Sequence, residues 1–545
     1  MESIRVKNLR ALKDTGSIKL SPITLALGEN SSGKSTFVRL FPLLKQSVSS
    51  STQGPLLFFG PYVDFGSFSD ALRYGENSKN ISISFDHSLR YRLPGLPRGS
   101  FADDLKVNFN VDICGSKLSG PEVPKVVRIE IQFAENIVIL NIGAGLGDLH
   151  LTSATVNGSN FDFAKHTEKI FSFDDATLIP NFVLAKRGEG TLEFVRQFGE
   201  SWRSLRNSIG LNLPTELSRR LVAYVSGYSD SRTSILKRRG YLGYLCPLRP
   251  HEFFRALSEI PSADQAWSRR LKKISASETL NSEEQDFYNI SMLHVAFSLC
   301  AISNSELKEI FENVTYLAPI RASAQRYYRL QNLGVREIDH TGENLPIYLA
   351  GLNVSQRDDL SRWVRKNLSI GFKTDGTGGH ISILIEDSHA GKYFNIADMG
   401  FGYSQVLPIV VQIWHVLNRS ENRHRPYHGG QGVDRILVIE QPELHLHPKM
   451  QANLAIIFVN AVNEAREKGI NLKLIVETHS AEIVNALGKL IAEKQLDSND
   501  ANIYLFNRTD KNNRNSEDLS VQRAEYMSNG KLKNWPWGFF EPSYK

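Results

Sequence analysis

The sequence predicts an α/β protein in which a mixed or parallel sheet with a β-rich lobe is interrupted by a helical insertion. Near the N-terminus an apolar strand runs into a glycine-rich loop and a helix, and strands and helices alternate again after Tyr316. Between about residues 165 and 312 the apolar spacing changes to that of helices. The helical segment therefore divides the sheet domain into an N-terminal and a C-terminal half.

The composition is that of a folded protein. The chain has 545 residues, of which 41% are hydrophobic, and this is enough apolar material to exclude wholesale disorder. Cys114, Cys246 and Cys300 form no CxxC pair, so a disulfide framework or a zinc ribbon is not expected. The N-terminus has no apolar signal core, and the longest apolar runs fall far short of the ~18 residues that a membrane span needs. We expect a cytoplasmic protein without membrane attachment.

The N-terminal half of the sheet domain is expected in residues 1–160. Its first residues alternate like two short strands around a turn, and the apolar run at 23–27 is typical of a buried strand. A Gly/Ser-rich loop at 28–36 and an amphipathic helix at about 37–45 follow. From 56 to about 155 the sequence is strand-rich and predicts the β-rich lobe.

The loop matches the phosphate-binding pattern G-x-x-x-x-G-K-[ST] in full, and it has the expected strand before it and helix after it. Its glycines would let the backbone wrap the phosphates of ATP. We expect Lys34 to contact the β and γ phosphates and the hydroxyl of Ser35 to ligate Mg²⁺. The predicted ATP-binding residues are Gly28, Glu29, Asn30, Ser31, Ser32, Gly33, Lys34, Ser35 and Thr36.

The helical insertion is expected in residues 161–312, with helical spacing around Leu192 to Phe198 and from Phe287 to Phe311. It carries the charge of the chain: residues 219–273 hold twelve Lys or Arg against four Asp or Glu, a net charge of +8, whereas the whole chain has +6. A near-neutral body with one basic segment suggests nucleic acid as a partner.

Aromatic residues are interleaved with this basic segment. Basic side chains can neutralise phosphates, and aromatic rings can stack on unpaired bases. Two interpretations are open. The segment could be a binding surface, for nucleic acid or alternatively for an acidic protein. It could instead be a solvated helical face whose aromatics lie in the core. The candidate nucleic-acid residues are Lys237, Arg238, Arg239, Arg269, Arg270, Lys272 and Lys273, and the aromatics are Tyr224, Tyr228, Tyr241, Tyr244, Phe253, Phe254 and Trp267.

The C-terminal half of the sheet domain is expected in residues 313–500, followed by a tail at 501–545 that contains the element WPWGFF. Alternating strand and helix signals in the first of these ranges indicate a parallel sheet. The expected elements are a hairpin at 380–396, a helix at 405–418, a buried strand at 436–439, a helix at 449–468, a strand at 472–476 and a further helix.

Three groups in this half could complete an ATP site. Glu440 follows a buried strand, where an acid can hold Mg²⁺. His479 follows the next strand, at the edge where open α/β sheets bind ligands. Residues 398–405 place two glycines and a Ser-Gln pair at a helix start, which is a plausible amide cradle for phosphate. Taken singly, each group has an ordinary alternative. The strand before Glu440 could be a core strand, His479 could be a capping or core histidine, and the glycine-rich segment could be a loop with a helix N-cap.

Their order along the chain resembles that of the ABC-type, AAA-family ATPase heads of the structural-maintenance (SMC), RecF and OLD group. The resemblance covers about residues 1–80 and 315–490 and implies an ABC-type ATPase head. It implies that Glu440 is the Walker B acid and His479 the switch histidine. By the same resemblance Gly402, Ser404 and Gln405 form the signature motif, which in such families contacts ATP held by a second subunit.

One residue departs from the family pattern. The glutamate that usually follows the Walker B acid and positions the attacking water is Gln441 here, which cannot accept a proton. Either Glu443 takes over, or hydrolysis is slow and the head acts as an ATP-held clamp. ATP binding is therefore a firmer expectation than ATP turnover.

The phrase EQPELHLHP at 440–448, together with residues 316–328 and 400–408 and the C-terminal WPWGFF, is similar to one prokaryotic branch of these ATPases. That branch includes OLD-like ATPases and the PtuA ATPase subunits of Septu anti-phage systems, including those tied to retrons. The resemblance implies an HNH nuclease partner and, in retron versions, a reverse transcriptase with its RNA–DNA product. Only 66 residues follow His479, too few for an added TOPRIM nuclease domain of ~100 residues. We therefore expect that the chain is not itself a nuclease.

Three functions remain open at this point. The first is an ATP-dependent switch: two heads close on two ATPs and control a partner nuclease in anti-phage defence. The second is a non-hydrolysing, ATP-bound scaffold that sequesters a toxic effector. The third is a RecF-like or OLD-like DNA repair ATPase.

Overall fold

The computed structural model describes residues 1–74, 79–89, 105–116, 122–144, 149–164, 168–172, 177–186, 213–261, 263–329, 334–335, 337–386, 391–419, 434–508 and 519–536. The chain forms two compact units, each built from separated stretches of sequence. The first unit contains Met1–Asn8, Ser47–Phe58 and Gly66–Glu309, and the second contains Leu9–Gln46, Phe59–Phe65 and Ile310–Lys545.

An antiparallel sheet is the centre of the first unit, as the predicted β-rich lobe requires. Its strands follow the order β12-β11-β9-β8-β7-β6-β5-β1, and β10 pairs with β9. Along β5 every second residue is buried, because alternate side chains of a strand point to opposite faces. The strands are β1 (Ser3–Leu9), β5 (Asn80–Leu89), β6 (Leu105–Ser116), β7 (Val123–Phe133), β8 (Asn136–Ala144), β9 (Leu149–Val156), β10 (Ser159–Asp162), β11 (Glu168–Ser172) and β12 (Phe182–Lys186); the short helix α3 is Phe68–Ala71.

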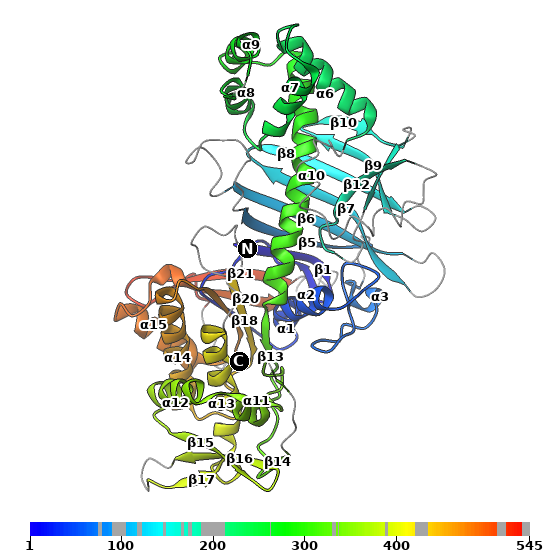
Figure 1. The fold of residues 1–545 in the computed structure, drawn as a ribbon. Helices are drawn as coiled ribbons and strands as arrows, with labels where there is room; N and C mark the ends of the chain where they lie inside the picture. Colours follow the sequence, from blue (N-terminus) through cyan, green and yellow to red (C-terminus); the bar gives the residue numbers. More distant parts are fainter. Residues whose placement is uncertain are drawn as a thin grey trace. The chain divides into compact units, whose positions relative to one another are not determined.

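The predicted helical insertion (161–312) begins with strands: β11 and β12 join the antiparallel sheet, so the sheet extends past the expected boundary at residue 161. The helices of the first unit follow from residue 215 onward. They are α6 (Thr215–Tyr228), α7 (Ile235–Tyr241), α8 (Pro250–Ser258), α9 (Gln265–Ser275) and α10 (Ser282–Glu312), with a short 3-10 turn at Leu242–Tyr244. In Figure 1 α10 runs beside the sheet, and Tyr288 on this helix donates a hydrogen bond to Asn136 at the start of β8 (2.8 Å). The helix predicted around Leu192 to Phe198 lies outside the described residues.

By length and composition alone α10 could cross a membrane. Its apolar side chains, such as Phe287, Leu293 and Cys300, are instead buried within the first unit. Burial against protein is the environment expected for the core helix of a globular unit.

A seven-stranded mixed sheet is the centre of the second unit, and it confirms the predicted α/β class. The strand order is β13-β18-β19-β4-β20-β21-β22. The first five strands run parallel, and β21 and β22 are antiparallel. Strand β4 is central and all six of its residues are buried. The bounds are β13 (Thr315–Leu317), β18 (Asp434–Glu440), β19 (Asn471–Glu477), β4 (Ile23–Gly28), β20 (Ala501–Arg508), β21 (Leu519–Tyr526) and β22 (Leu532–Lys533).

Helices cover this sheet, and an apolar cluster fills the space between them. They are α1 (Lys34–Val38), α2 (Leu40–Ser49), α11 (Leu345–Gly351), α12 (Val354–Leu368), α13 (Phe401–Asn418), α14 (Pro448–Glu467) and α15 (Ala481–Ala492). The helices and strands predicted from residue 405 to the helix after 476 are all present; α11 and α12 were not foreseen.

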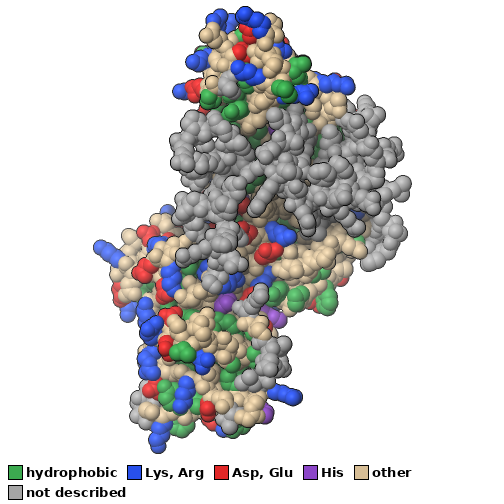
Figure 2. All heavy atoms as spheres, in the orientation of Figure 1, with side chains coloured by type: hydrophobic (Ala, Val, Ile, Leu, Met, Phe, Trp, Pro, Cys, Tyr) green, Lys and Arg blue, Asp and Glu red, His purple; other side chains and the backbone are tan. Residues whose placement is uncertain are grey.

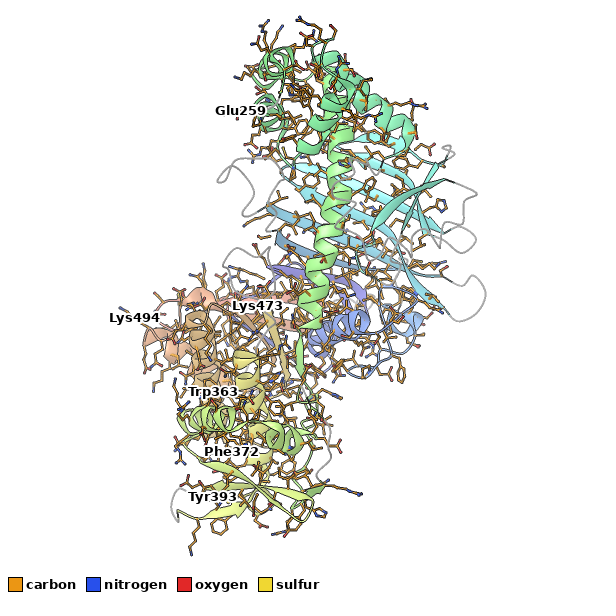
Figure 3. All side chains as sticks on the ribbon, in the orientation of Figure 1. Glu259, Trp363, Phe372, Tyr393, Lys473 and Lys494 are labelled. Carbon is orange, nitrogen blue, oxygen red and sulfur yellow. The ribbon has the colours of Figure 1, made fainter. Side chains whose placement is uncertain are left out.

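A smaller sheet joins the same core. It consists of β14 (Tyr328–Arg329), β15 (Phe372–Thr377), β16 (His380–Glu386) and β17 (Tyr393–Asn395), in the order β14-β16-β15 with β17 on β16. The predicted hairpin at 380–396 is the β16–β17 pair. Figure 3 shows Trp363 of α12 and Phe372 of β15 in this region, and both belong to the apolar cluster, whereas Tyr393 on β17 is exposed.

The segment expected as a tail contributes strands to the main sheet. Strand β20 pairs in parallel with β4, from Ala501 beside Ile23 to Phe506 beside Gly28. Of the WPWGFF element, Trp535 packs, partly buried, against the apolar cluster. Residues 537–545 lie outside the described part of the chain.

Candidate nucleotide and magnesium site

The phosphate loop connects the central strand β4 to α1, as its sequence predicts. Gly28 ends the strand at φ 149°, and a side chain there would collide with the carbonyl of Phe506 on β20. Gly33 caps α1 in the left-handed region at φ 88°, where a side chain would be strained. The loop therefore needs glycine at both ends, for packing at the first and for backbone conformation at the second.

Two polar side chains of the loop point inward. Lys34 is only 3% exposed, and its ammonium donates a hydrogen bond to the carbonyl of Glu29 (2.5 Å). Burial lowers the pKa of Lys34, and the negative charges of nearby carboxylates partly oppose that shift. The hydroxyl of Ser32 is buried and makes no hydrogen bond to any described residue. Buried donors without partners are costly, and phosphate oxygens would satisfy them.

Two carboxylates stand side by side at the carboxyl ends of adjacent strands. Glu440 ends β18, Glu477 ends β19, and the two residues are paired in the parallel register. Their exposed fractions are 1% and 2%. Two like charges in a buried position oppose full ionisation of both, so the pair is suited to a cation.

Glu440 is held by three side chains. The guanidinium of Arg39 donates from Nε to both carboxylate oxygens (2.9 and 3.2 Å) and from Nη2 to one of them (2.9 Å). The hydroxyl of Tyr316 also donates to the carboxylate (2.7 Å). The buried guanidinium of Arg321 donates to the backbone carbonyl of Glu440 (3.1 Å), and burial lowers its pKa to about 10. The predicted Walker B acid thus lies in a dense polar network.

Glu477 is held less completely. Its Oε1 accepts a hydrogen bond from the hydroxyl of Ser35 (2.8 Å), and its Oε2 has no hydrogen-bond partner among the described residues. Burial, followed by the charge of Glu440, raises the pKa of Glu477 to about 7. The sequence-based prediction missed Glu477 and Arg39; an acid directly after the apolar run 474–476 was the available signal for the former.

Gln441 and Glu443 shape the loop after β18. Gln441 adopts φ 42°, in the left-handed region, and its backbone N–H donates to the backbone carbonyl of Glu477 (2.8 Å). Glu443 accepts from the hydroxyl of Thr478 (2.8 Å) and from the amide of His479 (2.7 Å). Because both oxygens of Glu443 are engaged, this carboxylate braces the loop that carries His479.

His479 and Lys34 belong to the same neighbourhood. His479 is an exposed residue, but part of its ring is shielded from water. This partial burial, followed by the positive charge of Lys34, lowers the pKa of the imidazole. The following residue, Ser480, caps α15 by accepting from the amide of Ile483 (3.2 Å). The helix cap thus fixes the backbone on one side of His479, and Glu443 fixes it on the other.

The predicted signature residues open helix α13. Gly400 precedes the helix with φ 81°. The hydroxyl of Ser404 donates to the backbone carbonyl of Phe401 (2.7 Å), and the side-chain amide of Gln405 donates weakly to the same hydroxyl (3.4 Å). Ser404 is 6% exposed, so its hydroxyl is largely used within its own helix turn. A contact with a nucleotide on a second subunit would have to reach this turn and remains a prediction.

The oxygen ligands at the phosphate loop fit magnesium. Mg²⁺ takes oxygen ligands and binds proteins through one or two carboxylates together with phosphates. Strand pairing places Glu440 and Glu477 side by side, and the hydroxyl of Ser35 donates a hydrogen bond to Glu477. The unpartnered Oε2 of Glu477 could accept a cation. Across the described residues no group of three or more His, Cys, Asp or Glu is arranged to hold a metal ion.

The basic segment forms an exposed charged surface, but its aromatics face inward. Figure 2 shows Lys and Arg side chains over the helices of the first unit. The large aromatics Tyr241, Phe253, Phe254 and Trp267 are buried in the core. The interpretation that these four rings stack on bases is therefore wrong, since apolar burial claims them. Of the candidate cations, Lys237, Arg239, Arg269, Arg270, Lys272 and Lys273 are exposed, and Arg238 is half-buried with hydrogen bonds to the carbonyls of Asp230 (2.7 Å) and Ser231 (2.9 Å).

Two family models match the chain. Residues 351–484 match the family described as AAA ATPase domain, and residues 496–544 match one described as protein of unknown function (DUF3696). The first match contains α13, Glu440, Glu477 and His479, and it supports the predicted ATPase class. The phosphate loop lies outside both matched ranges and rests on its own motif and geometry.

Endonuclease GajA of Bacillus cereus (strain HuB5-5) is 27% identical over 112 residues, which are 19% of this chain and 15% of that protein. The Smc head domain of Pyrococcus furiosus, solved with the C-terminal domain of ScpA, is 11% identical with a TM-score of 0.31 over 96% of both chains. The SMC head domain of Thermotoga maritima is 7% identical with a TM-score of 0.31, over 96% of this chain and 97% of that one.

Proposed function

We propose that this chain is the ATP-binding subunit of an ABC-type ATPase that dimerises on ATP and controls a partner nuclease in anti-phage defence. One observation carries the proposal: β4 brings Lys34 and Ser35 of a complete phosphate loop beside two buried strand-end acids. Each part of that arrangement has a role in ATP chemistry, and the parts come from opposite ends of the chain.

The residues divide the work of ATP binding. The loop amides and Lys34 hold the β and γ phosphates, because the loop opens a helix and the ammonium is buried beside it. Ser35 and Glu440 would hold magnesium, which neutralises phosphate charge when it is bound. His479, whose pKa is influenced by the charge of Lys34, would contact the terminal phosphate. In a dimer, Gly402, Ser404 and Gln405 would meet the nucleotide of the second subunit.

Turnover is proposed to be slow. Gln441 cannot take a proton from water, and both oxygens of Glu443 are engaged by Thr478 and His479. A tightly bound, slowly hydrolysed nucleotide suits a switch that stays closed until it is triggered. The non-hydrolysing scaffold is the limiting case of this behaviour.

The proposed partners follow from the sequence similarity of this chain to Endonuclease GajA and from its resemblance to PtuA ATPase subunits. The match to Endonuclease GajA, which extends over 112 residues, supports an association with nuclease chemistry. We assign cleavage to a separate HNH-type subunit in the cytoplasm, in the manner of PtuA-containing Septu systems, with a reverse transcriptase and its RNA–DNA product in a retron version. The exposed cations of α7 and α9 are the proposed nucleic-acid contacts.

The test is ATP binding and turnover by the Lys34→Ala variant. The substitution removes the buried ammonium, so affinity for ATP should fall at least tenfold, and any phosphate release should fall with it. Isothermal titration with ATP and a phosphate-release assay measure both. Lys366→Ala, which changes an exposed lysine on α12, is the matched control and should behave as wild type.

Two outcomes would change the proposal. Wild-type protein that binds no ATP would overturn it. Binding without any Lys34-dependent phosphate release would favour the scaffold over the switch. A RecF-like or OLD-like repair role would be favoured if loss of the chain sensitised cells to DNA damage and left phage resistance unchanged.

A further inference from the structure

The carboxylate of Glu477 has a different environment from that of Glu440, although the two are neighbours in the sheet. Glu440 accepts hydrogen bonds from Arg39 and Tyr316, and both of its oxygens are occupied. The carboxylate of Glu477 accepts one hydrogen bond, from Ser35, and its second oxygen is buried without a partner among the described residues. A structural acid at 2% exposure would be expected to have both oxygens satisfied.

The position of Glu477 points to a ligand of positive charge. The residue that it contacts, Ser35, is the phosphate-loop hydroxyl expected to bind magnesium. Strand pairing places Glu477 next to Glu440, so a second carboxylate adds negative charge at the same edge of the sheet. Arg39 already balances the charge of Glu440 through an ion pair of 2.9 Å. Glu477 receives a hydrogen bond only from the neutral hydroxyl of Ser35; among the described residues the positive charges of Lys34 and Arg39 act on it without forming an ion pair.

We infer that Glu477 is the carboxylate that positions the magnesium of ATP together with Ser35, and that Glu440 is held beside it by Arg39 as a supporting residue. This inference rests on the proposed ATP binding, because the cation is the one that accompanies the nucleotide. It transfers the principal metal-positioning role from the acid at the Walker B position to one on the adjacent strand. The unpartnered oxygen of Glu477 supplies the ligand atom, and the hydroxyl of Ser35 lies 2.8 Å from the other oxygen.

A positioning role separates cation binding from nucleotide binding. The phosphate loop and Lys34 bind the phosphates themselves, whereas Glu477 acts through the cation. Removal of the Glu477 charge should therefore weaken the part of ATP affinity that depends on magnesium and spare the part that persists in EDTA. A purely structural acid would weaken both parts equally, through loss of folded protein.

The test compares Glu477→Gln with Glu440→Gln and a matched control in the full chain. The non-hydrolysable analogue AMP-PNP is titrated in excess Mg²⁺ and in EDTA, and Mn²⁺ binding to the AMP-PNP complex is followed by electron paramagnetic resonance. For Glu477→Gln we expect at least a tenfold loss of the Mg²⁺-dependent gain in affinity, and a similar loss of Mn²⁺ affinity, with the EDTA value unchanged. Glu440→Gln should lose less. Glu467→Gln, an exposed acid on α14, should match wild type.

Several results would overturn the inference. One is a Glu477→Gln protein that keeps the full Mg²⁺-dependent gain and wild-type Mn²⁺ affinity; another is a loss confined to Glu440→Gln. If Glu477→Gln does not fold, Glu477→Asp keeps the charge and retracts it, and an unchanged Mn²⁺ affinity in that variant would be equally decisive. If Lys34→Ala loses AMP-PNP while Glu477→Gln behaves as wild type, the proposed function stands and only this inference fails; wild type that binds no nucleotide removes both.

Discussion

At the scale of single residues, the charge of Glu477 makes stability depend on pH. Burial and the neighbouring carboxylate of Glu440 raise the pKa of Glu477 from its ordinary value of 4.5 to about 7. The folded protein therefore holds this proton to higher pH than the unfolded chain does. The stability that this adds is fully present below about pH 4.5 and is lost as the pH rises through about 7.

Glu477→Gln should consequently stabilise the nucleotide-free protein at alkaline pH. At pH 8 we expect the variant to exceed wild type in free energy of unfolding by up to about 3 kcal/mol, since one pKa unit corresponds to about 1.4 kcal/mol. At pH 5 the difference should be small, because the wild-type carboxyl is then protonated when folded. Urea denaturation at the two pH values measures it. An equal difference at both pH values would contradict the assigned cause, and Glu467→Gln should show none.

At this scale the features that could be predicted are local in the sequence. The phosphate loop from Gly28 to Ser35 is one continuous motif, and the structure has the expected strand before it and helix after it, while its role in ATP binding stays a prediction. Glu477 and Arg39 were missed because their partners are remote: Ser35 lies 442 positions from Glu477, and Arg39 lies 401 positions from Glu440. No single-sequence pattern reports that two distant polar residues share a strand end.

At the scale of elements, the basic helices α7 and α9 are held together by one partly buried acceptor, Asp264. Asp264 caps α9 by accepting from the amide of Trp267 (2.8 Å), and it also accepts from the hydroxyl of Thr233 (2.8 Å) before α7. The hydroxyl of Tyr241 on α7 is a further donor to it (3.3 Å). These bonds connect α7 to α9, while the aromatic side chains face the core and the cations face solvent.

Charge reversal on these helices tests the nucleic-acid proposal. In Lys237→Glu/Arg239→Glu/Lys272→Glu we expect weaker binding of single-stranded DNA or RNA and a shallower dependence on salt, by roughly 0.7 in the log–log slope for each phosphate that is no longer neutralised. Fluorescence anisotropy over a salt series measures both quantities. Lys308→Glu, an exposed change on α10, is the matched control. Unchanged affinity and slope would sink the proposal.

The sequence predicted these helices but not the direction of their aromatics. Aromatic residues at helical spacing form a stripe on one face of the helix, but the spacing is the same for a face buried in the core and for a face that stacks on bases. Trp267 illustrates the outcome: its indole donates to the carbonyl of Leu257 (2.7 Å) inside the unit. Only packing against α8 and α10 decides between the two interpretations.

At the scale of the whole molecule, both compact units are assembled from separated stretches of chain. The main sheet of the second unit takes β4 from the N-terminal region and every other strand from beyond residue 314. Strand alternation predicted the parallel C-terminal half, but the insertion of β4 between β19 and β20 is a long-range pairing that periodicity cannot reveal. The expected tail beyond residue 500 supplies one of those two neighbours.

Packing at β20 should therefore control ATP binding. Ile503 is fully buried and pairs in register with Leu25 of β4. Ile503→Ala should cost about 2–5 kcal/mol of unfolding free energy and lower ATP affinity, because it loosens the strand that carries the phosphate loop. Ile456→Ala, which is 40% exposed on α14, is the matched control and should cost far less. Urea denaturation and ATP titration compare the two variants; equal costs would contradict the buried position of β20 beside the central strand β4.

The position of β4 also fixes when the ATP site can come into existence. A ribosome completes Gly28 early, but the flanking strands, Asn471–Glu477 and Ala501–Arg508, emerge more than four hundred residues later. At ~5–20 residues per second that interval is roughly 20 to 90 seconds. Until then β4, whose six residues are all buried in the folded sheet, has no partner strand on either edge, and its exposed apolar side chains are a natural substrate for chaperones. A translation product that stops before β20 should consequently be unable to hold nucleotide, however complete its phosphate loop.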